Sequence, residues 1–333
     1  MKKTFDVVGK KKYFYTFSLA VIIIIAIILS FVLGMGVAIE FKGGTIITYS
    51  YTGTIDADAV AAAASEAAGE SCNATLGESL ADGMTTVSLS FPSSQGFTAE
   101  KQSELTDALN EQFSENTLAL YNSQDVNPTT GAGFFGKCLV AVAFSAVVMI
   151  VYIGFRFRKI GGWVAGVCSV IALIHDMCFV YACFVVCRFE INANFMAVLL
   201  TILGYSINAT IIIYDRIREN RRLYGDEKTL DEYVNMSVTQ SMGRSVHTTA
   251  TTAIAMAAVC VVALVAGVDS ILSFSFPLLI GLLAGVYSSN CIAPTLWTMW
   301  QGAIDRKKAE KKKSAKTAGA GAGASASASA KAK

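Results

Sequence analysis

The sequence predicts an α-helical membrane protein with six transmembrane helices and one exported α+β domain inserted between helices 1 and 2. Two observations lead to this fold class. First, 53% of the residues are apolar and only 16% are charged, which is too apolar for an ordinary soluble domain. Second, the apolar residues gather in long runs, one near the N-terminus and the others after a polar stretch of roughly a hundred residues.

The first apolar run covers Tyr13–Leu33 and contains no charged residue. A helix rises about 1.5 Å per residue, so about twenty such residues cross the roughly 30 Å apolar core of a bilayer. A signal peptide has a shorter apolar region followed by a small-residue cleavage site, and Gly34-Met35-Gly36 fits such a site poorly. We therefore expect an uncleaved membrane anchor.

Five further runs have the length of spanning helices, the form in which a backbone satisfies its own polar groups in lipid. The predicted spans are Phe134–Phe155, Gly162–Val186, Asn192–Tyr214, Val246–Gly267 and Leu272–Trp297. Four regions follow: the N-terminus with helix 1 (1–35), the exported domain (36–133), helices 2–6 with a cytoplasmic loop at 215–245 (134–301), and a tail (302–333). The basic, Ala/Ser/Gly-rich composition of the tail predicts disorder.

The distribution of lysine and arginine predicts the orientation of the chain. Basic residues precede the first span, fill the connections between spans 2 and 3 and between spans 4 and 5, and recur in the tail from Arg306. Short cytoplasmic loops carry such an excess, so both termini are expected on the cytoplasmic side of a bacterial plasma (inner) membrane. Arg188, beside Glu190, lies on the other side and is too little to reverse the pattern.

Alternating strand and helix signals occupy the exported domain. Asp56–Gly69 begins with a capping residue, and Thr98–Asn116 has apolar residues at helical spacing, so both predict helices. A hairpin turn is predicted at Asp82-Gly83. The predicted strands are Thr45–Tyr51, Cys72–Glu78, Met84–Phe91 and Thr117–Ser123, and the resulting order β-α-β-β-α-β is the ferredoxin-like arrangement. An amphipathic helix and a turn are expected in the cytoplasmic segment Asp215–Arg244.

The eight cysteines raise the question of disulfides or a metal site. Seven lie in predicted spans or, for Cys187, directly after one, where cysteine behaves as a small apolar residue, and Cys72 is the one in the exported domain. The sequence has no C-x-x-C motif, and His175 and His247 are far apart. We therefore expect no disulfide framework, no metal and no cofactor. The spans also lack the residue sets that an intramembrane enzyme needs.

Asp176 is the one carboxylate deep in a predicted span. Ionisable groups are costly there, so each is a functional hypothesis by default. Successive residues of a helix point about 100° apart, so His175 and Asp176 are not expected to share one ligand site. Two interpretations remain open: a proton-exchanging carboxylate, or a protonated Asp hydrogen-bonded across to the fourth span.

A polar stripe follows one face of the fourth span, with residues at three- or four-residue spacing. Its members are Thr201, Gly204, Asn208, Ile211 and Asp215. Hydroxyl and amide side chains hydrogen-bond between helices and glycine permits close approach, so the stripe predicts a polar pathway or an interhelical seam. Gly281 and Gly285 predict helix packing of the same kind.

Arg244 lies at the mouth of the fifth span and is followed by Ser245 and a run of threonines. An arginine in this position is commonly an anchor that extends to the lipid headgroups. The hydroxyls that follow it are less ordinary, because a helix that faces only lipid does not need them. They indicate a polar path or a dense helix contact.

Five segments, taken in order, resemble the SecD/SecF family of protein-export membrane proteins. One contains Glu40, Gly43, Gly44 and Thr45 just outside the first span. The others are Ala172–Asp176 in span 3, Gly204–Asn220 in span 4, Arg244-Ser245 in span 5 and Gly285–Ser289 in span 6. Any one segment alone is a weak signal, whereas five in the right order are specific.

The resemblance implies a non-enzymatic accessory subunit that pairs with SecD. The pair would assist a SecY-type channel complex in moving exported polypeptides across the plasma membrane, coupled to a proton or sodium gradient. The residues implied to form an ion relay or polar seam are Asp176, Thr201, Asn208, Asp215 and Arg244. The alternative is a half-size transporter of small molecules or lipids from the related resistance-nodulation-division superfamily. The bilayer is an expected partner and nucleic acid is not.

One departure from the family bears on ion coupling. The family usually has Asn-Asp-Thr where this chain has Asn208-Ala209-Thr210, and proton transfer in the family is ascribed to that Asp. Alanine cannot titrate, so three readings are open: Asp176 does the work, SecD supplies the carboxylate, or this subunit is not coupled to an ion gradient. We favour the second, because a shared pathway tolerates the loss of one contributor. Glu40 stands where the family usually has Asp and keeps the charge.

Overall fold

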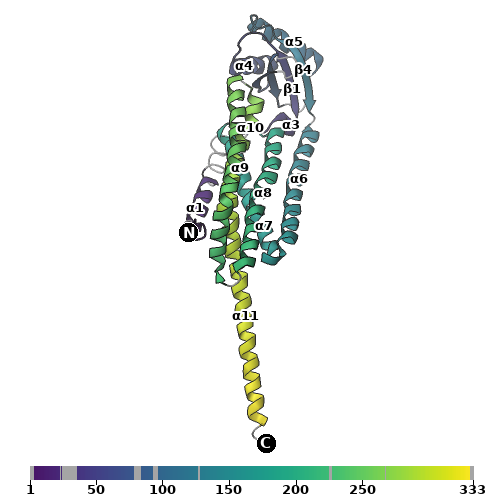
Figure 1. Cartoon of the computed structure of the whole chain (residues 1–333). Helices are drawn as coiled ribbons and strands as arrows, with labels where there is room; N and C mark the ends of the chain where they lie inside the picture. Colours follow the sequence, from purple (N-terminus) through teal and green to yellow (C-terminus); the bar gives the residue numbers. More distant parts are fainter. Residues whose placement is uncertain are drawn as a thin grey trace.

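The computed structural model describes residues 4–22, 24, 36–78, 84–92, 97–126, 128–224, 227–266 and 268–330. A small α+β domain lies at one end of a bundle of long helices, and the C-terminal helix extends from the other end (Figure 1). Five helical stretches in the described residues are long and apolar enough to cross a membrane, in agreement with predicted spans 2–6. Of the first predicted span, α1 (Lys11–Val21) is described, and residues 23 and 25–35 lie outside the described part.

The bundle is built from helices that follow the apolar runs of the sequence. It contains α6 (Pro128–Arg156), the 3-10 turn η2 (Arg158–Ile160), α7 (Gly162–Val186), α8 (Ala193–Tyr224), α9 (Leu230–Ala266), α10 (Asp269–Tyr287), the π-helical turn η4 (Ser288–Ile292) and α11 (Ala293–Ala330). The helix and turn expected within Asp215–Arg244 are supplied by the spans themselves, because α8 continues to Tyr224 and α9 begins at Leu230. Lengthening a helix adds one hydrogen bond per residue without a new nucleation step.

The α+β domain follows the predicted order of elements. After the short helix α3 (Ile39–Lys42) come β1 (Gly44–Ser50), α4 (Ala57–Ala68), β2 (Asn73–Glu78), β3 (Thr85–Phe91), α5 (Ala99–Gln112) and β4 (Ala119–Val126). All strand pairs are antiparallel, and the order across the sheet is β2-β3-β1-β4. The turn predicted at Asp82-Gly83 lies outside the described residues.

Local capping explains where the two domain helices begin. The Asp56 side chain accepts a hydrogen bond from the backbone N–H of Asp58 (3.1 Å), and Thr98 accepts one from that of Lys101 (3.4 Å). The buried residues of the helices and of β1 and β3 form one core, which contains Ile47, Tyr49, Val60, Val87, Leu89, Leu105 and Leu109. Burial raises the pKa of the Cys72 thiol to about 12, so this cysteine stays protonated at neutral pH.

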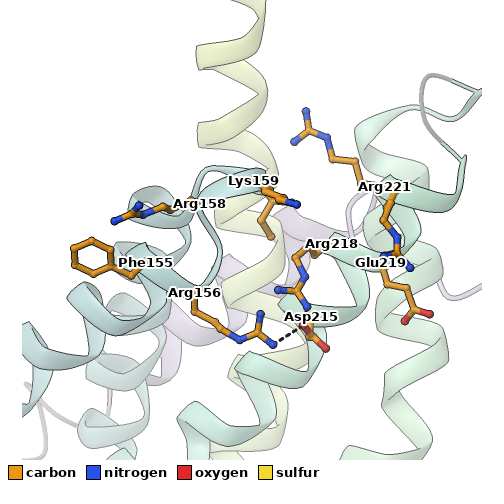
Figure 2. Close-up of a pocket in the computed structure, with 10 residues that line it drawn as sticks. Phe155, Arg156, Arg158, Lys159, Asp215, Arg218, Glu219 and Arg221 are labelled. Carbon is orange, nitrogen blue, oxygen red and sulfur yellow. Dashed lines mark hydrogen bonds and ion pairs between the residues drawn. The ribbon is translucent and has the colours of Figure 1, made fainter.

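The bundle end away from the α+β domain is rich in arginine. One carboxylate oxygen of Asp215 on α8 lies 3.3 Å from Arg156 at the end of α6 and 2.6 Å from Arg218 (Figure 2). The N-terminal segment packs at this end too, because the backbone N–H groups of Val7 and Val8 donate to Asn235 on α9 (2.9 and 3.0 Å).

The tail is assigned to the C-terminal helix for most of its length. Helix α11 continues to Ala330, whereas the composition of residues 302–333 predicts no fixed structure. Alanine and lysine, which dominate its first half, have high intrinsic helix propensity, and a helix satisfies its backbone hydrogen bonds without tertiary packing. The part that packs is the beginning of the helix, where Trp297 is fully buried.

Candidate functional site

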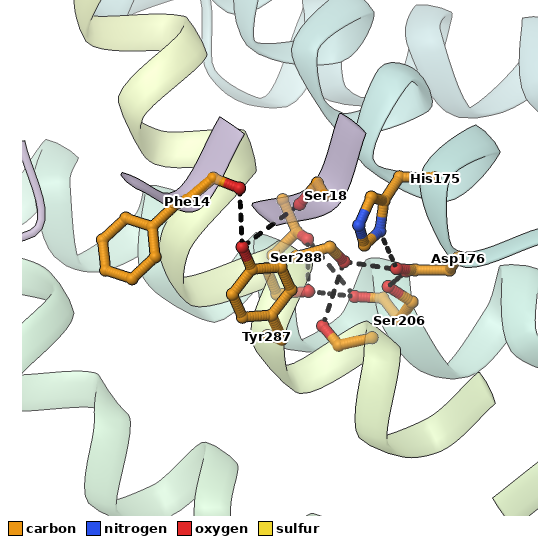
Figure 3. Close-up of polar contacts among 10 residues, drawn as sticks. Phe14, Ser18, His175, Asp176, Ser206, Tyr287 and Ser288 are labelled. Carbon is orange, nitrogen blue, oxygen red and sulfur yellow. Dashed lines mark hydrogen bonds and ion pairs between the residues drawn. The ribbon is translucent and has the colours of Figure 1, made fainter. Parts of the chain in front are cut away.

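Asp176 is the centre of a buried polar cluster within the bundle. It lies on α7 and its side chain is fully buried. Its Oδ2 accepts hydrogen bonds from Ser206 on α8 (2.7 Å) and from Ser288 in η4 (2.8 Å), as Figure 3 shows. This one carboxyl oxygen therefore links α7 to α8 and η4. A hydrogen bond between Asp176 and the fourth span was one of the two interpretations of the sequence, and it is present.

His175 is part of the same cluster, although the helical geometry predicted that it would diverge from Asp176. Its Nδ1 lies 3.1 Å from Asp176 Oδ1, because both side chains turn toward the interior of the bundle. The imidazole also packs against the rings of Phe179 and Tyr287, at centroid distances of 4.7 and 5.8 Å. Its Nε2 is buried without a hydrogen-bond partner among the described residues.

A second set of hydroxyls supports the serines that hold Asp176. Thr210 donates to the Oγ of Ser289 (2.9 Å), and Ser289 donates to the backbone oxygen of Ser206 (3.1 Å). These residues were not among the predicted site residues. The sequence feature that could have identified them is a pair of hydroxyl residues four apart in span 4 and an adjacent pair in span 6.

The π-helical turn η4 explains how adjacent serines both reach the interior. All five residues of η4 are buried, with Ser288 directed to Asp176 and Ser289 to α8. Single π-helical turns within longer helices are frequent at functional sites. This local departure from α-helical spacing is not visible in the sequence periodicity.

Two glycines of α10 permit this convergence of helices. A Cβ atom at Gly285 would stand 3.2 Å from the Cβ and Oγ of Ser206, and one at Gly281 would overlap the side chain of Ile202. Because both positions lack a Cβ, α10 can approach α8 closely. That approach brings η4 within reach of Asp176.

The first helix touches the cluster through Tyr287. The hydroxyl of Tyr287 donates to the backbone oxygen of Phe14 (2.9 Å) and lies 3.1 Å from Ser18 Oγ, both on α1 (Figure 3). Since Tyr287 also packs against His175, its side chain links α1 to the cluster.

The polar stripe of α8 does not join this cluster. Thr201, Gly204 and Asn208 are exposed, on the opposite side of the helix from Ser206. Thr201 donates to its own backbone at Ala197 (2.7 Å). A Cβ at Gly204 would meet no atom within 4 Å among the described residues, so Gly204 mediates no close helix contact with this part of the chain, contrary to expectation.

Arg244 is exposed on α9, next to this outward face of α8. The two helices are linked there by hydrogen bonds from the Tyr205 hydroxyl to Thr249 (3.2 Å) and Thr252 (3.4 Å). Within the part of the chain that the structure describes, no carboxylate pairs with Arg244. Asp215 is engaged at the basic end of the bundle. The predicted relay residues thus fall into three places: Asp176 inside the bundle, Asp215 at its basic end, and Thr201, Asn208 and Arg244 on the exposed faces of α8 and α9.

The family motif outside the first span forms the junction between the α+β domain and the bundle. Glu40 on α3 accepts a hydrogen bond from the backbone N–H of Ala193, at the start of α8 (2.8 Å). Gly43 has a φ of 85°, which favours glycine, and Gly44 begins β1. Thr45 is fully buried and donates to Asp125 on β4 (2.5 Å).

This junction continues along the connection between α7 and α8. The backbone N–H of Ala38 donates to Ile191 O (3.0 Å), and that of Ile191 donates to Gly36 O (2.9 Å). Asn73 on β2 donates to the Glu190 side chain (2.7 Å). These contacts tie the sheet to the start of α8, the helix that carries both Ser206 and Asn208.

Replacing Glu40 with alanine is expected to lower the unfolding free energy by about 1 kcal/mol, which corresponds to a fall of about 2 °C in Tm. The carboxylate caps the positive end of α8, and its loss leaves the Ala193 N–H unpaired. Thermal unfolding of the purified chain in detergent measures the change. Glu66→Ala, at an exposed position in α4, is the matched control. Equal midpoints for the two variants would contradict a role for Glu40 in holding the junction.

No group of three His, Cys, Asp or Glu side chains in the described residues is arranged to hold a metal ion. The chemistry available at the cluster is hydrogen bonding and proton exchange at the Asp176–His175 pair. The chemistry available at the outward face is attraction of an anionic group by Arg244.

Comparisons with known proteins agree with the membrane architecture. Residues 105–303 match the family described as protein export membrane protein SecD/SecF, C-terminal. The chain is 32% identical over 326 residues to protein translocase subunit SecF of Alicyclobacillus acidocaldarius, covering 95% of this chain and 99% of that relative. It is 33% identical over 303 residues to protein translocase subunit SecDF of Bacillus subtilis, covering 89% of this chain but 38% of the longer relative.

Solved structures give the same likeness in three dimensions. A crystal structure of SecDF from Thermus, described as a translocon-associated membrane protein, matches with a TM-score of 0.74 and 26% identity, over 90% of this chain and 39% of that one. SecDF in its super-membrane-facing form matches with a TM-score of 0.66 and 26% identity, over 93% and 40% of the two chains.

Proposed function

The chain belongs to the SecD/SecF family of protein-export membrane proteins, and on this premise we propose that it is an accessory subunit of a Sec-type protein translocase. It acts with a SecD partner and a SecY-type channel complex to promote export of polypeptides across the plasma membrane. The observation that carries this proposal is the similarity to a SecF subunit over 95% of this chain and 99% of the relative. The partnership with SecD is supported by the SecDF relative, in which this chain's counterpart is part of a longer protein.

The architecture that we propose has six spans with both termini in the cytoplasm. Tyr13–Leu33 forms the first span, and residues 36–133 form an exported ferredoxin-like domain. The strand order β2-β3-β1-β4 with antiparallel pairing supports this domain assignment. The arginine-rich end of the bundle supports the orientation, since short cytoplasmic segments are enriched in basic residues.

Ion coupling, in this proposal, uses the outward face of α8 and α9. Thr201, Asn208 and Arg244 are exposed on helices that we place in the membrane. A polar group within a span and an arginine at the mouth of one are both stabilised by a partner, and Ala209 leaves this stretch of α8 without its own carboxylate. We propose that SecD covers this face and supplies the titrating carboxylate opposite Arg244, for a proton or sodium pathway shared by the two subunits.

Asp176 has a different role in this proposal. Ser206, its partner on α8, lies on the opposite side of that helix from Asn208, so the buried cluster is separate from the shared pathway. A lone carboxylate buried without a cation is costly, so the Asp176–His175 pair is held net neutral. The cluster then acts as a joint that keeps α7, α8 and η4 in register while the exported domain moves.

The proposed function is tested by gradient-dependent completion of protein export in membrane vesicles. Vesicles that contain the SecY-type channel and SecD are compared with vesicles that also contain this chain. Addition of the chain is expected to raise the gradient-dependent rate about tenfold and to leave the rate without a gradient unchanged. A matched preparation treated with an ionophore, which collapses the gradient, gives the rate without a gradient. An equal rate with and without the chain would overturn the proposed function.

A further inference from the structure

A cavity of about 790 Å³ opens at the arginine-rich end of the bundle, between the end of α6 with η2 and the end of α8 (Figure 2). Its basic side chains come from both sides: Arg156, Arg158 and Lys159 from α6 and η2, and Arg218, Arg221 and Arg222 from α8. Two carboxylates, those of Asp215 and Glu219, also line it. The cavity wall therefore carries a clear excess of positive charge.

The two carboxylates are already engaged. Asp215 is shared between Arg156 and Arg218, at 3.3 and 2.6 Å. Glu219 lies 2.6 Å from Arg216, a residue outside the cavity wall. Among the described residues no carboxylate pairs with Lys159, Arg221 or Arg222.

Repulsion among these cations is relieved by an anion that accepts several N–H bonds at once. A phosphate group fits this chemistry, because arginine presents a planar fork of donors that matches its oxygens. The separate origin of the cations, from two helices that meet at one end of the bundle, lets a single phosphate be held from both sides.

The apolar surface beside the cavity indicates the source of the phosphate. Phe155, which lines the cavity, is 53% exposed, and it ends a row of exposed apolar side chains on one face of α6. Above it in the same row lie Phe144 (68% exposed), Val148 (46%) and Tyr152 (49%). Trp163 packs beside Phe155 at a ring distance of 5.9 Å and is itself 55% exposed, as aromatic residues at a membrane interface are.

We propose that this cavity binds the phosphate headgroup of an anionic phospholipid, whose acyl chains lie along the exposed face of α6. Basic pockets between membrane helices on the cytoplasmic side are suited to such headgroups. The combination of unpaired cations with an adjoining apolar row distinguishes a lipid from a soluble phosphate. The bound lipid would bridge α6 and α8 at the end of the bundle away from the junction with the exported domain.

The test is native mass spectrometry of the full chain, delipidated in detergent and titrated with phosphatidylglycerol or with neutral phosphatidylcholine. Wild type is expected to prefer phosphatidylglycerol. The triple variant Lys159→Gln/Arg221→Gln/Arg222→Gln is expected to bind it about tenfold more weakly. The triple variant Lys42→Gln/Lys101→Gln/Arg188→Gln removes the same charge from exposed positions at the other end of the molecule and is expected to match wild type.

Two further variants separate lost binding from lost folding. Arg221→Lys/Arg222→Lys keeps the charge and is expected to keep most of the preference. Asp215→Asn removes the carboxylate that occupies Arg156 and Arg218, so phosphatidylglycerol is expected to bind several-fold more tightly. Unfolding weakens lipid binding and does not strengthen it. Tighter binding by Asp215→Asn would therefore show that the cations of the cavity hold the lipid.

Three outcomes would overturn the proposal. The first is a cavity triple variant that binds phosphatidylglycerol as tightly as wild type. The second is displacement of the lipid by equimolar inorganic phosphate, which would assign the cavity to a soluble anion. The third is a triple variant that keeps the lipid but loses copurification with SecD, which would assign the cavity to an acidic protein segment.

Discussion

Replacement of Arg244 by glutamine is expected to abolish the gradient-dependent stage of protein export, lowering its rate at least about tenfold, to that of vesicles without the chain. Arg244 is exposed on α9, and none of the described carboxylates pairs with it. If SecD supplies the missing carboxylate, the guanidinium stabilises its charged form, and glutamine removes that stabilisation while keeping much of the side-chain volume. Export completion in vesicles with SecD, with and without a proton gradient, measures the effect.

Three variants define what the Arg244 result means. Arg244→Lys keeps the charge but not the fork of donors, so a partial rate is expected. Arg188→Gln removes an exposed arginine from the connection between α7 and α8 and is expected to leave the rate unchanged. Ala209→Asp is expected to leave the gradient-dependent step intact, because in our proposal SecD already supplies the carboxylate of the pathway. Full activity of Arg244→Gln would contradict a coupling pathway on this face.

The α+β domain was the most predictable part of the fold, since its signals are local. Asp56 and Thr98 cap helices within one turn of themselves, and strand alternation follows from which face of the sheet meets the core. The spans were equally accessible because length and composition alone decide whether a helix can cross a bilayer. The extent of α11 was not, because its Lys/Ala-rich part has a high helix propensity whereas the Gly/Ser/Ala repeats that follow have the composition of a disordered tail.

The candidate site was predicted in part. Asp176 was recognised because a carboxylate in an apolar run is costly wherever it points, whereas its partners Ser206 and Ser288 were missed because serine is tolerated in many membrane environments. Periodicity placed Thr201 and Asn208 on one face of α8 but could not tell a face that packs within the chain from one that looks outward. That distinction depends on which face of α8 packs against α10. The glycines that permit this packing, Gly281 and Gly285, are distant from α8 in the sequence.

Asp176→Leu is expected to lower the unfolding free energy by about 2 to 4 kcal/mol, because it leaves the buried hydroxyl of Ser206 without its acceptor and Ser288 with only the longer bond to Gly285 O (3.3 Å). The leucine also removes the partner of His175 Nδ1. Thermal unfolding in detergent measures this, and Tm is expected to fall by about 4 to 8 °C. Thr201→Leu, on the exposed face of the neighbouring helix, is the control for introducing a leucine into this part of the bundle.

The second substitution at this position, Asp176→Asn, reports the charge of the buried pair. A carboxamide oxygen can accept from both serines while its NH₂ donates to His175 Nδ1, so asparagine reproduces the contacts of a protonated carboxyl. We therefore expect Asp176→Asn to lie within about 1 kcal/mol of wild type in stability and to retain gradient-dependent export. An ionised aspartate paired with an imidazolium would behave differently, because asparagine would then leave a buried cation unpaired. A stable Asp176→Asn variant that loses gradient-dependent export would move the proton pathway from the outward face of α8 to the interior of α7.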